Sequence, residues 1–435
     1  MDYLLKFCKL YNQQGCIFMR IDKKFFLIIL GSSLEYYDFV LYGLLATQIS
    51  KTFFPASNSK LQLIQGLSVF ALGYLVRPLA GTILGMIADR YNNVKIFAFS
   101  ILLMGTSTLF IGVLPSYETI GIAAPLLLIL ARIMQGISFA AEIPGAVTIL
   151  SNSYWKQNIS SSIGYLMSST NFGFIMASIL IYLVHLFFTE ETVLSWGWRI
   201  PFLIGGVLAF ISYYIRRDLT LFFDLKKNCP SRISLKQFLS EIVVANFKGI
   251  LQGTGITSLI ASGTMFFIYL PHLLEEHYTL SSHDIRLFFF LGLITFIVFC
   301  LVFGKLLKNY DIRTFFIGTI LTFPLMVYFL ILQINLIGGR PSLFLLFACY
   351  EIYMAAIFTS GLSLLSQLFP LHLRNTSISW CYNLSFSIFS FMPAIVTYII
   401  AETKRAEIIS LLFFVLSLIL IVALFSKNLN FIKRT

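Results

Sequence analysis

Charged residues are scarce in this chain of 435 residues. Asp, Glu, Lys and Arg together make up 11% of it, against about 25% in soluble globular proteins. A soluble protein of this length would bury a large core, but it would still need a charged shell that these residues cannot supply. Because 58% of the residues are hydrophobic and the mean hydropathy is +0.86, we expect most of the surface to face lipid.

Clustered cysteines are also missing. None of the six cysteines forms a pair at Cys-x-x-Cys spacing, and three lie inside apolar runs. Zinc sites and disulfide frameworks depend on such spacing. We therefore expect no metal site and no disulfide framework, and we interpret the cysteines as small apolar residues that fill space.

Long apolar runs dominate what is present. A spanning helix needs about 20 mostly apolar residues. This length predicts an all-α integral membrane protein with twelve transmembrane helices. The predicted spans are 25–50, 62–87, 95–114, 120–149, 160–187, 197–215, 249–273, 285–306, 312–333, 341–368, 375–401 and 406–426. The predicted units are an N-terminal segment 1–24, a six-helix bundle 25–215, a basic linker 216–248, a six-helix bundle 249–426 and a tail 427–435.

Lys and Arg are concentrated in alternate connections between these runs. If the N-terminus faces the cytoplasm, the inside-facing segments hold 22 Lys and Arg and the outside-facing loops hold 7. The positive-inside rule then places both termini in the cytoplasm. This distribution accounts for the net charge of +12 without a nucleic-acid partner. In the linker, residues 235–242 have apolar side chains at i, i+3, i+4 and i+7, which predicts a short helix on the inner membrane surface.

Only a few ionisable residues interrupt the apolar runs. A charge at the bilayer centre costs roughly 2.5–3.5 kcal/mol on insertion scales, so each is a candidate functional residue. They are Glu35, Asp38, Arg77, Arg132, Glu142 and Glu351, with His185 near the end of its run. Glu351 lies near the start of its run, where reaching the membrane interface is the simpler explanation.

The first run carries two carboxylates one helical turn apart. Glu35, Asp38 and Tyr42 are spaced i, i+3 and i+7 and share one helix face. Two carboxylates this close in a low dielectric repel each other, so one is expected to hold a proton. We predict a proton carrier here. The alternative is a structural ion pair with an arginine of a neighbouring helix.

The fourth run carries a second polar face. Arg132, Gln135, Phe139 and Glu142 lie on it. The Arg132 guanidinium is suited to hold a substrate carboxylate through two parallel hydrogen bonds, or to pair with a carboxylate of the first run. A permanent internal salt bridge is the alternative. We predict that Arg132 and Glu142 join the two carboxylates of the first run in proton coupling.

Seven short motifs, in order along nearly the whole chain, resemble those of the metabolite:proton symporters of the major facilitator superfamily. That branch includes the proline/glycine-betaine carriers. The motifs are LEYYDFVLYG at 34–43, FFP at 53–55, RPLAG at 77–81, the stretch 115–125, RIMQGISFAAE at 132–142, SWGWRIPF at 195–202, and the Leu-Phe-Pro, Arg and Tyr-Asn positions within 368–383.

The resemblance implies two six-helix bundles around a central cavity that opens to either side in turn. It implies symport of a proton with a small zwitterion or organic acid, with the proton gradient in place of any cofactor. The implied partners are this solute, the proton and the lipid bilayer. We expect a monomer in the plasma (inner) membrane.

Aromatic and amide side chains dominate the candidate substrate site. Aromatic faces hold quaternary ammonium groups and an arginine holds a carboxylate, which together suit proline or a betaine. The candidates are Tyr42, Arg77, Arg132, Tyr165, Asn171, Tyr269, Tyr382 and Asn383.

The loop after the second run departs from the superfamily pattern. Gly85, Asp89 and Arg90 match its gating loop, but Asn92 stands where a second glycine is expected. In the second half, Lys308 stands where an aspartate is expected. We predict that Gly85, Asp89 and Arg90 gate the cytoplasmic side, while altered gating or a degenerate transporter is the alternative.

Three other functions remain open. One is an organic-anion or dicarboxylate:proton symporter. Another is a non-transporting sensor with a carrier fold. The third, a polytopic membrane enzyme, needs a catalytic cluster in an interfacial loop. The outer loops offer only Glu190 with Glu191 and the acidic and histidine residues of 275–284, with no recognisable spacing. We therefore predict that the protein is not an enzyme.

Overall fold

The computed structural model describes residues 25–55, 59–90, 93–152, 158–222, 246–277, 281–336, 339–403 and 405–425. The predicted N-terminal segment 1–24, the surface helix 235–242 and the tail 427–435 lie outside these ranges. Throughout the described ranges the regular structure is helical, with no strand, as the sequence predicts.

The helices of the first half begin with Phe25–Leu44. After it come α2 (Ala46–Phe53), α3 (Ser59–Leu75), α4 (Arg77–Arg90), α5 (Asn93–Val113), α6 (Tyr117–Ile120), α7 (Ala123–Asn152), α8 (Ile159–Phe187), α9 (Glu190–Ser195), the 3-10 turn η2 (Gly197–Arg199) and α10 (Ile200–Phe222).

The second half contains α12 (Phe247–His277), α13 (Ser282–Leu306), α14 (Ile312–Leu336), α15 (Gly339–Leu368), α16 (Arg374–Phe389), α17 (Met392–Thr403), η4 (Ala406–Ile408) and α18 (Ile409–Phe425). Breaks at Leu45, at Val76 and at residues 390–391 divide three of the predicted spans into two consecutive helices each.

Each of the twelve predicted spans corresponds to helix. Within the described ranges, nine helices are long and apolar enough to cross a membrane on those criteria alone. The other three spans are α5, α10 and α16 with α17. The α16 helix has a low mean hydropathy because it contains several Ser, Asn and Arg residues, and their side chains are buried. The α10 helix continues to Phe222, beyond the predicted end at 215.

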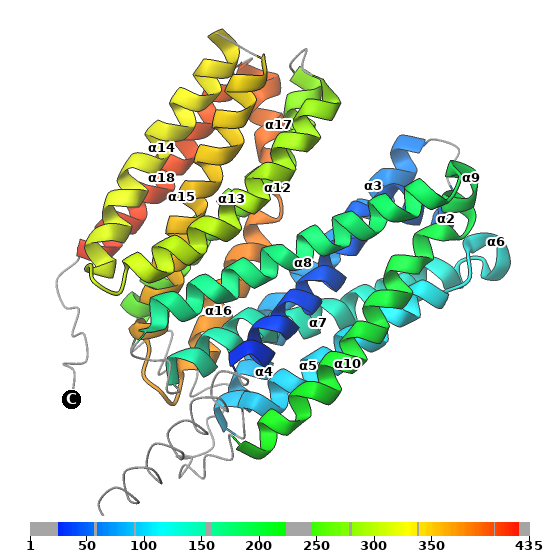
Figure 1. Ribbon diagram of the computed structural model, residues 1–435, viewed down its shortest axis with the longest axis horizontal. Helices are drawn as coiled ribbons and strands as arrows, with labels where there is room; N and C mark the ends of the chain where they lie inside the picture. Colours follow the sequence, from blue (N-terminus) through cyan, green and yellow to red (C-terminus); the bar gives the residue numbers. More distant parts are fainter. Residues whose placement is uncertain are drawn as a thin grey trace, which may run out of the picture.

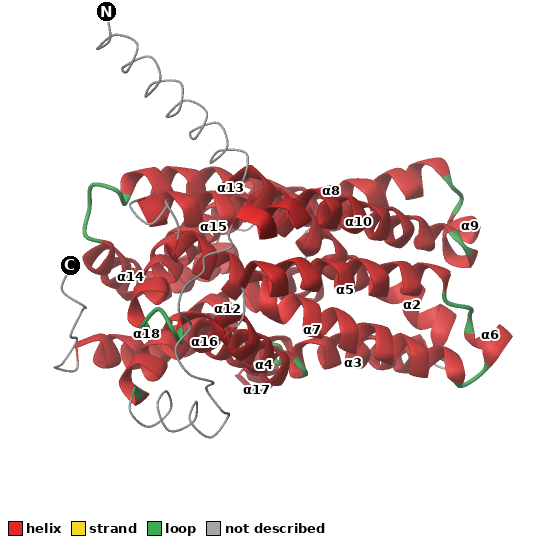
Figure 2. Ribbon diagram, turned by 90° about the horizontal axis from the view of Figure 1, so that it is seen from below, coloured by secondary structure: helices red, strands yellow, loops and turns green. Residues whose placement is uncertain are grey.

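The helices form two bundles, one from the first half and one from the second (Figure 1). They contact each other mainly through α4 with α16, α7 with α16, and α8 with α13. From these contacts the bundles diverge toward the ends that carry α9 and α17 (Figure 1). Figure 2 shows the helices of both halves running in one general direction. We call the end with the α4–α5 and α13–α14 connections the linker end, and the opposite end the far end.

Polarity is distributed as expected for a protein in lipid. Large apolar side chains such as Leu79, Phe329 and Val422 are exposed on the outer surface. The ionisable residues of the apolar runs are buried instead, with Asp38, Arg77 and Arg132 at 0% exposure. The bundles therefore hide their charges from the hydrocarbon, where an unpaired polar group has no partner.

Candidate functional site

A cavity lies between the two bundles, and both contribute to its wall. The first half contributes Tyr36, Phe39, Tyr74, Arg77, Phe139, Ile143, Met167, Thr170, Asn171 and Phe174. The second half contributes Thr264, Met265, Phe267, Ile268, Leu293, Phe296, Glu351, Met354, Phe358, Tyr382 and Phe386. The wall is thus mainly apolar and aromatic. Among these lining residues, Arg77 and Glu351 are the two that carry a charge.

Arg77 begins α4 and is fully buried in the cavity wall. Its Nε donates to Oδ1 of Asn383 at 3.2 Å. The guanidinium lies 4.7 Å from the ring centre of Phe139 and 5.0 Å from that of Tyr74. Its Nη1 and Nη2 atoms have no hydrogen-bond partner in the part of the chain that the structure describes. A guanidinium fork with two unused donors is suited to bind a carboxylate.

Asn383 of α16 holds Arg77 from the other half. Its Nδ2 donates to the carbonyl oxygens of Ala140 and Ser379, both at 2.9 Å, which orients Oδ1 toward Arg77. The close approach depends on Gly81, where a Cβ would lie 2.3 Å from the Asn383 amide nitrogen. Asn383 therefore positions the guanidinium across the interface between the bundles.

Four of the predicted substrate residues belong to this region. Arg77, Asn171 and Tyr382 line the cavity, and Asn383 bonds to Arg77. The ring of Tyr382 also packs on that of Phe386, with centroids 4.6 Å apart. These side chains were predicted from their chemistry, as aromatic, amide and arginine groups within apolar runs, and the packing of the halves brings them together.

The other four predicted substrate residues lie outside the cavity lining. Tyr42 donates its hydroxyl to the Gly66 carbonyl at 3.0 Å. Tyr165 is 40% exposed and packs edge-on against Phe25, while Tyr269 hydrogen-bonds to Thr397. The fourth is Arg132. Because sequence spacing leaves the rotation of each helix undetermined, it did not separate these residues from the lining.

Arg132 is buried within the first bundle. Its Nη1 donates to Gln135 Oε1 at 2.6 Å, and Gln135 in turn donates to Thr108 at 2.9 Å. The guanidinium lies 4.3 Å from the ring centre of Tyr42 and 5.1 Å from that of Phe70. The sequence offered a pairing with a carboxylate of the first run as one option for Arg132. Of those carboxylates, Asp38 has no hydrogen-bond partner for its oxygens in the described ranges.

The predicted proton-coupling carboxylates are also buried inside the first bundle. Glu35 and Glu142 are 1% exposed and Asp38 is 0% exposed. Ser32 donates to Glu142 Oε1 at 2.5 Å. Asp38 faces α10, where a Cβ added to Gly205 would lie 2.2 Å from Oδ1. All three carboxylates lie outside the cavity lining. Tyr36 and Phe39 directly follow Glu35 and Asp38 in the chain, and both line the cavity.

Glu351 lies deeper than the sequence analysis expects. It is 4% exposed and lines the cavity from α15, rather than reaching the membrane interface. The predicted span starts at 341, and ten residues of α-helix rise about 15 Å. The ten residues between the predicted helix start and Glu351 therefore already indicated a position near the centre of the membrane.

The predicted gating residues Gly85 and Asp89 contact the second bundle at the linker end. The Asp89 carboxylate accepts from the backbone N–H groups of Asn375 at 3.2 Å and Thr376 at 2.8 Å, and from the Thr376 hydroxyl at 2.6 Å. These donors lie at the start of α16, where a negative charge is favoured by the helix dipole. Arg90 is exposed at the end of α4.

A second contact closes the linker end between α8 and α13. Ser161 donates its hydroxyl to the Gly304 carbonyl at 2.7 Å. A Cβ at Gly164 would lie 2.4 Å from the Cys300 carbonyl oxygen, so the two helices touch backbone to backbone. The two halves are therefore joined at the linker end by two separate sets of contacts.

Lys308, which stands where the superfamily pattern has an aspartate, lies in the connection between α13 and α14. Lys308 is exposed, and the nearby Asp311 caps α14 by accepting from the Thr314 N–H at 2.9 Å and hydroxyl at 2.7 Å. The Thr314 hydroxyl holds the pKa of Asp311 below its usual value. This loop thus stabilises its own helix, and the described inter-bundle contact on this side comes from Ser161 and Gly304.

Substitution of Gly85 by alanine is expected to open the linker end. The new Cβ would lie 2.8 Å from the Thr376 Cα, and an overpacked contact of this kind costs about 1–3 kcal/mol. We expect maleimide to label a cysteine at Ser161 about tenfold faster, in a background without native cysteines. Gly318→Ala is the control, because nothing lies within 4 Å of its Cβ position. An unchanged labelling rate in Gly85→Ala would contradict a gating role.

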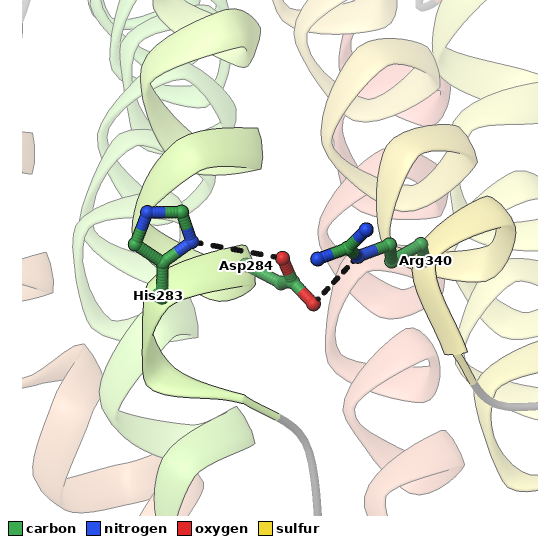
Figure 3. Close-up of polar contacts among 3 residues, drawn as sticks. All are labelled: His283, Asp284 and Arg340. Carbon is green, nitrogen blue, oxygen red and sulfur yellow. Dashed lines mark hydrogen bonds and ion pairs between the residues drawn. The ribbon is translucent and has the colours of Figure 1, made fainter.

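Ion pairs at the far end join helices of the second bundle (Figure 3). Arg340 of α15 donates to Asp284 of α13 at 2.9 Å, and His283 Nδ1 lies 3.8 Å from the other Asp284 oxygen. Arg286 and Glu275 join α13 to α12 at 3.6 Å. The described ranges contain no group of three or more His, Cys, Asp or Glu residues able to hold a metal ion.

Comparisons with known proteins give one consistent result. The family model described as Major Facilitator Superfamily matches residues 28–380. The proline/betaine transporter of Salmonella typhimurium is 30% identical over 397 residues, covering 86% of this chain and 77% of that protein. A putative proline/betaine transporter of Staphylococcus aureus is 31% identical over 383 residues, covering 86% and 81%.

Solved structures share the fold. A proton:xylose symporter superposes with a TM-score of 0.71 at 12% identity, covering 93% of this chain and 94% of that one. A human organic anion transporter gives 0.69 at 13% identity, covering 92% and 99%. These structures bear on the fold alone, and with the family match they confirm the predicted twelve-helix architecture. The protein is a multi-pass membrane transporter rather than an enzyme, and the chain belongs to the major facilitator superfamily.

Proposed function

We propose that this protein is a proton-coupled symporter that imports a small zwitterion such as proline or a betaine by alternating access. The main support is Arg77, a buried guanidinium in an aromatic cavity wall whose two terminal nitrogens have no hydrogen-bond partner in the described part of the chain. A substrate carboxylate would take up both donors. The aromatic rings of the lining, such as Tyr36 and Phe267, would face a methylated ammonium group.

The carboxylates of the first helix are proposed to carry the proton. Asp38 is fully buried and its oxygens have no hydrogen-bond donor in the described ranges. Burying an ionised carboxylate without a donor is costly, so we expect this conformation to hold a proton there. The same helix lines the cavity through Tyr36 and Phe39. Loss of the proton from Asp38 would therefore affect the cavity wall directly, because Asp38, Tyr36 and Phe39 belong to the same helix.

The orientation follows from the distribution of Lys and Arg. The segments of the sequence that connect helices at the linker end hold most of the Lys and Arg found in such connections, so we assign this end and both termini to the cytoplasm of the plasma (inner) membrane. The contacts at Asp89 and Ser161 then close the cytoplasmic side. Because one chain supplies both walls of the cavity, a monomer is sufficient for transport.

An organic-anion or dicarboxylate substrate is the alternative. Arg77 alone would suit an anion. If Arg77 held one carboxylate of a dicarboxylate, the second would lie near Glu351 rather than near another basic residue. Arg77 is the one basic residue of the lining as described. The charges of the cavity thus favour a zwitterion.

The proposal is tested by uptake into proteoliposomes of labelled proline, glycine betaine, oxoglutarate and shikimate, with and without a pH gradient. We expect zwitterion uptake that is faster with acid outside. One proton per solute gives about tenfold accumulation for each pH unit, because one unit corresponds to 1.36 kcal/mol. Protein-free liposomes are the control. Gradient-driven uptake restricted to the dicarboxylate would overturn the proposal.

A further inference from the structure

Glu351 is a buried carboxylate in the cavity wall. It lies on α15 of the second half, whereas Arg77 lies on α4 of the first. Within the described ranges neither side chain takes part in an ion pair. The cavity therefore presents one basic and one acidic side chain from opposite bundles, and they are not paired with each other.

The surroundings of Glu351 are suited to a cation. The lining of the second half also includes the rings of Phe267 and Phe296. A Cβ built on Gly292 of α13 would lie 3.4 Å from the Phe267 ring and 3.5 Å from Glu351 Cγ, so the ring and the acidic side chain lie close to the same point. A quaternary ammonium donates no hydrogen bond and is stabilised by aromatic faces and a nearby negative charge. A protonated secondary amine would in addition donate to the carboxylate.

We propose that Glu351 is the counter-charge for the cationic nitrogen of the substrate. The first half then holds the carboxylate through Arg77, and the second half holds the ammonium through Glu351. A bound zwitterion bridges the two bundles electrostatically. An anion without a cationic group leaves Glu351 unpaired, which disfavours the closed state around it. This inference rests on the proposed zwitterion transport and names the specificity residue of that same site.

Glycine betaine and 3,3-dimethylbutyrate form a matched pair of probes. They have nearly the same shape and the same carboxylate, but a neutral carbon replaces the charged nitrogen in the second. Equilibrium binding of each to the purified full-length protein is measured for wild type, Glu351→Gln and Glu351→Asp. In wild type we expect betaine to bind at least about 30-fold tighter than 3,3-dimethylbutyrate. This is the difference in affinity expected when one partner of a buried charge pair is missing.

In Glu351→Gln we expect betaine affinity to fall by at least about 30-fold while 3,3-dimethylbutyrate affinity is retained. Glu351→Asp is expected to recover part of the preference because it keeps the charge. Retained 3,3-dimethylbutyrate binding shows that the variant is folded. Glu118→Gln is the control, since Glu118 is exposed in α6 at the far end and should leave both affinities unchanged.

Two results would overturn the proposal: unchanged betaine affinity in Glu351→Gln, or an equal loss for both probes, which would indicate a structural role. Failure of the proposed function is a separate result, because wild type itself would then bind neither betaine nor proline. With wild-type betaine binding intact, the affinity ratio in the variants tests Glu351 alone.

Discussion

Arg77→Gln is expected to lower kcat/KM for zwitterion uptake by at least about 100-fold, equivalent to about 2.7 kcal/mol. Removing one partner of a buried, hydrogen-bonded charge pair costs about 2–5 kcal/mol, and the substrate carboxylate would lose both donors. The substitution also removes the bond to Asn383. Initial rates of glycine betaine uptake into proteoliposomes, corrected for the amount of inserted protein, measure the effect.

Arg77→Lys separates charge from geometry. Lysine keeps the positive charge but presents a point charge in place of the planar fork, so we expect a loss intermediate between wild type and Arg77→Gln. Arg286→Gln is the control, since its side chain is 70% exposed at the far end. Near wild-type kinetics in Arg77→Gln would exclude Arg77 from substrate binding.

Asp38→Asn is expected to abolish accumulation while transport down a gradient continues. Asparagine imitates the protonated carboxyl group in size and cannot release a proton. Steady-state accumulation should fall from about tenfold per pH unit, for one coupled proton, to a ratio of about one. Measurements of accumulation and of substrate exchange in the same proteoliposomes distinguish lost coupling from lost folding.

The buried position of Asp38 makes this result informative. Its oxygens lie against Gly205 in the interior of the first bundle rather than in the cavity, so the substitution leaves the substrate-lining residues in place. Exchange should therefore remain within about threefold of wild type. Glu190→Gln, in an exposed position at the far end, should change neither quantity. Persistent pH-driven accumulation in Asp38→Asn would assign coupling to another group.

Predictions based on local pattern agree with the structure most closely. The spans follow from runs of apolar residues, and the loop motif identified Gly85 and Asp89, which contact the other bundle at the linker end. Arg77, Tyr382 and Asn383 were also predicted, and they lie together although Arg77 and Asn383 are 306 positions apart. By contrast, Tyr165 and Tyr269 lie outside the cavity lining, because a tyrosine in an apolar run has no local signal for the direction it faces.

By itself, the sequence determined that this protein spans a membrane with helices and buries a small set of charges, because transfer of each segment into lipid depends on its own composition. Only the tertiary structure decided which charges share the cavity. Helix rotation is set by contacts between distant segments, such as Gly205 against Asp38 and Asn383 against Arg77. Packing of that kind placed Arg77 and Glu351 in one cavity and placed Asp38 outside the cavity lining.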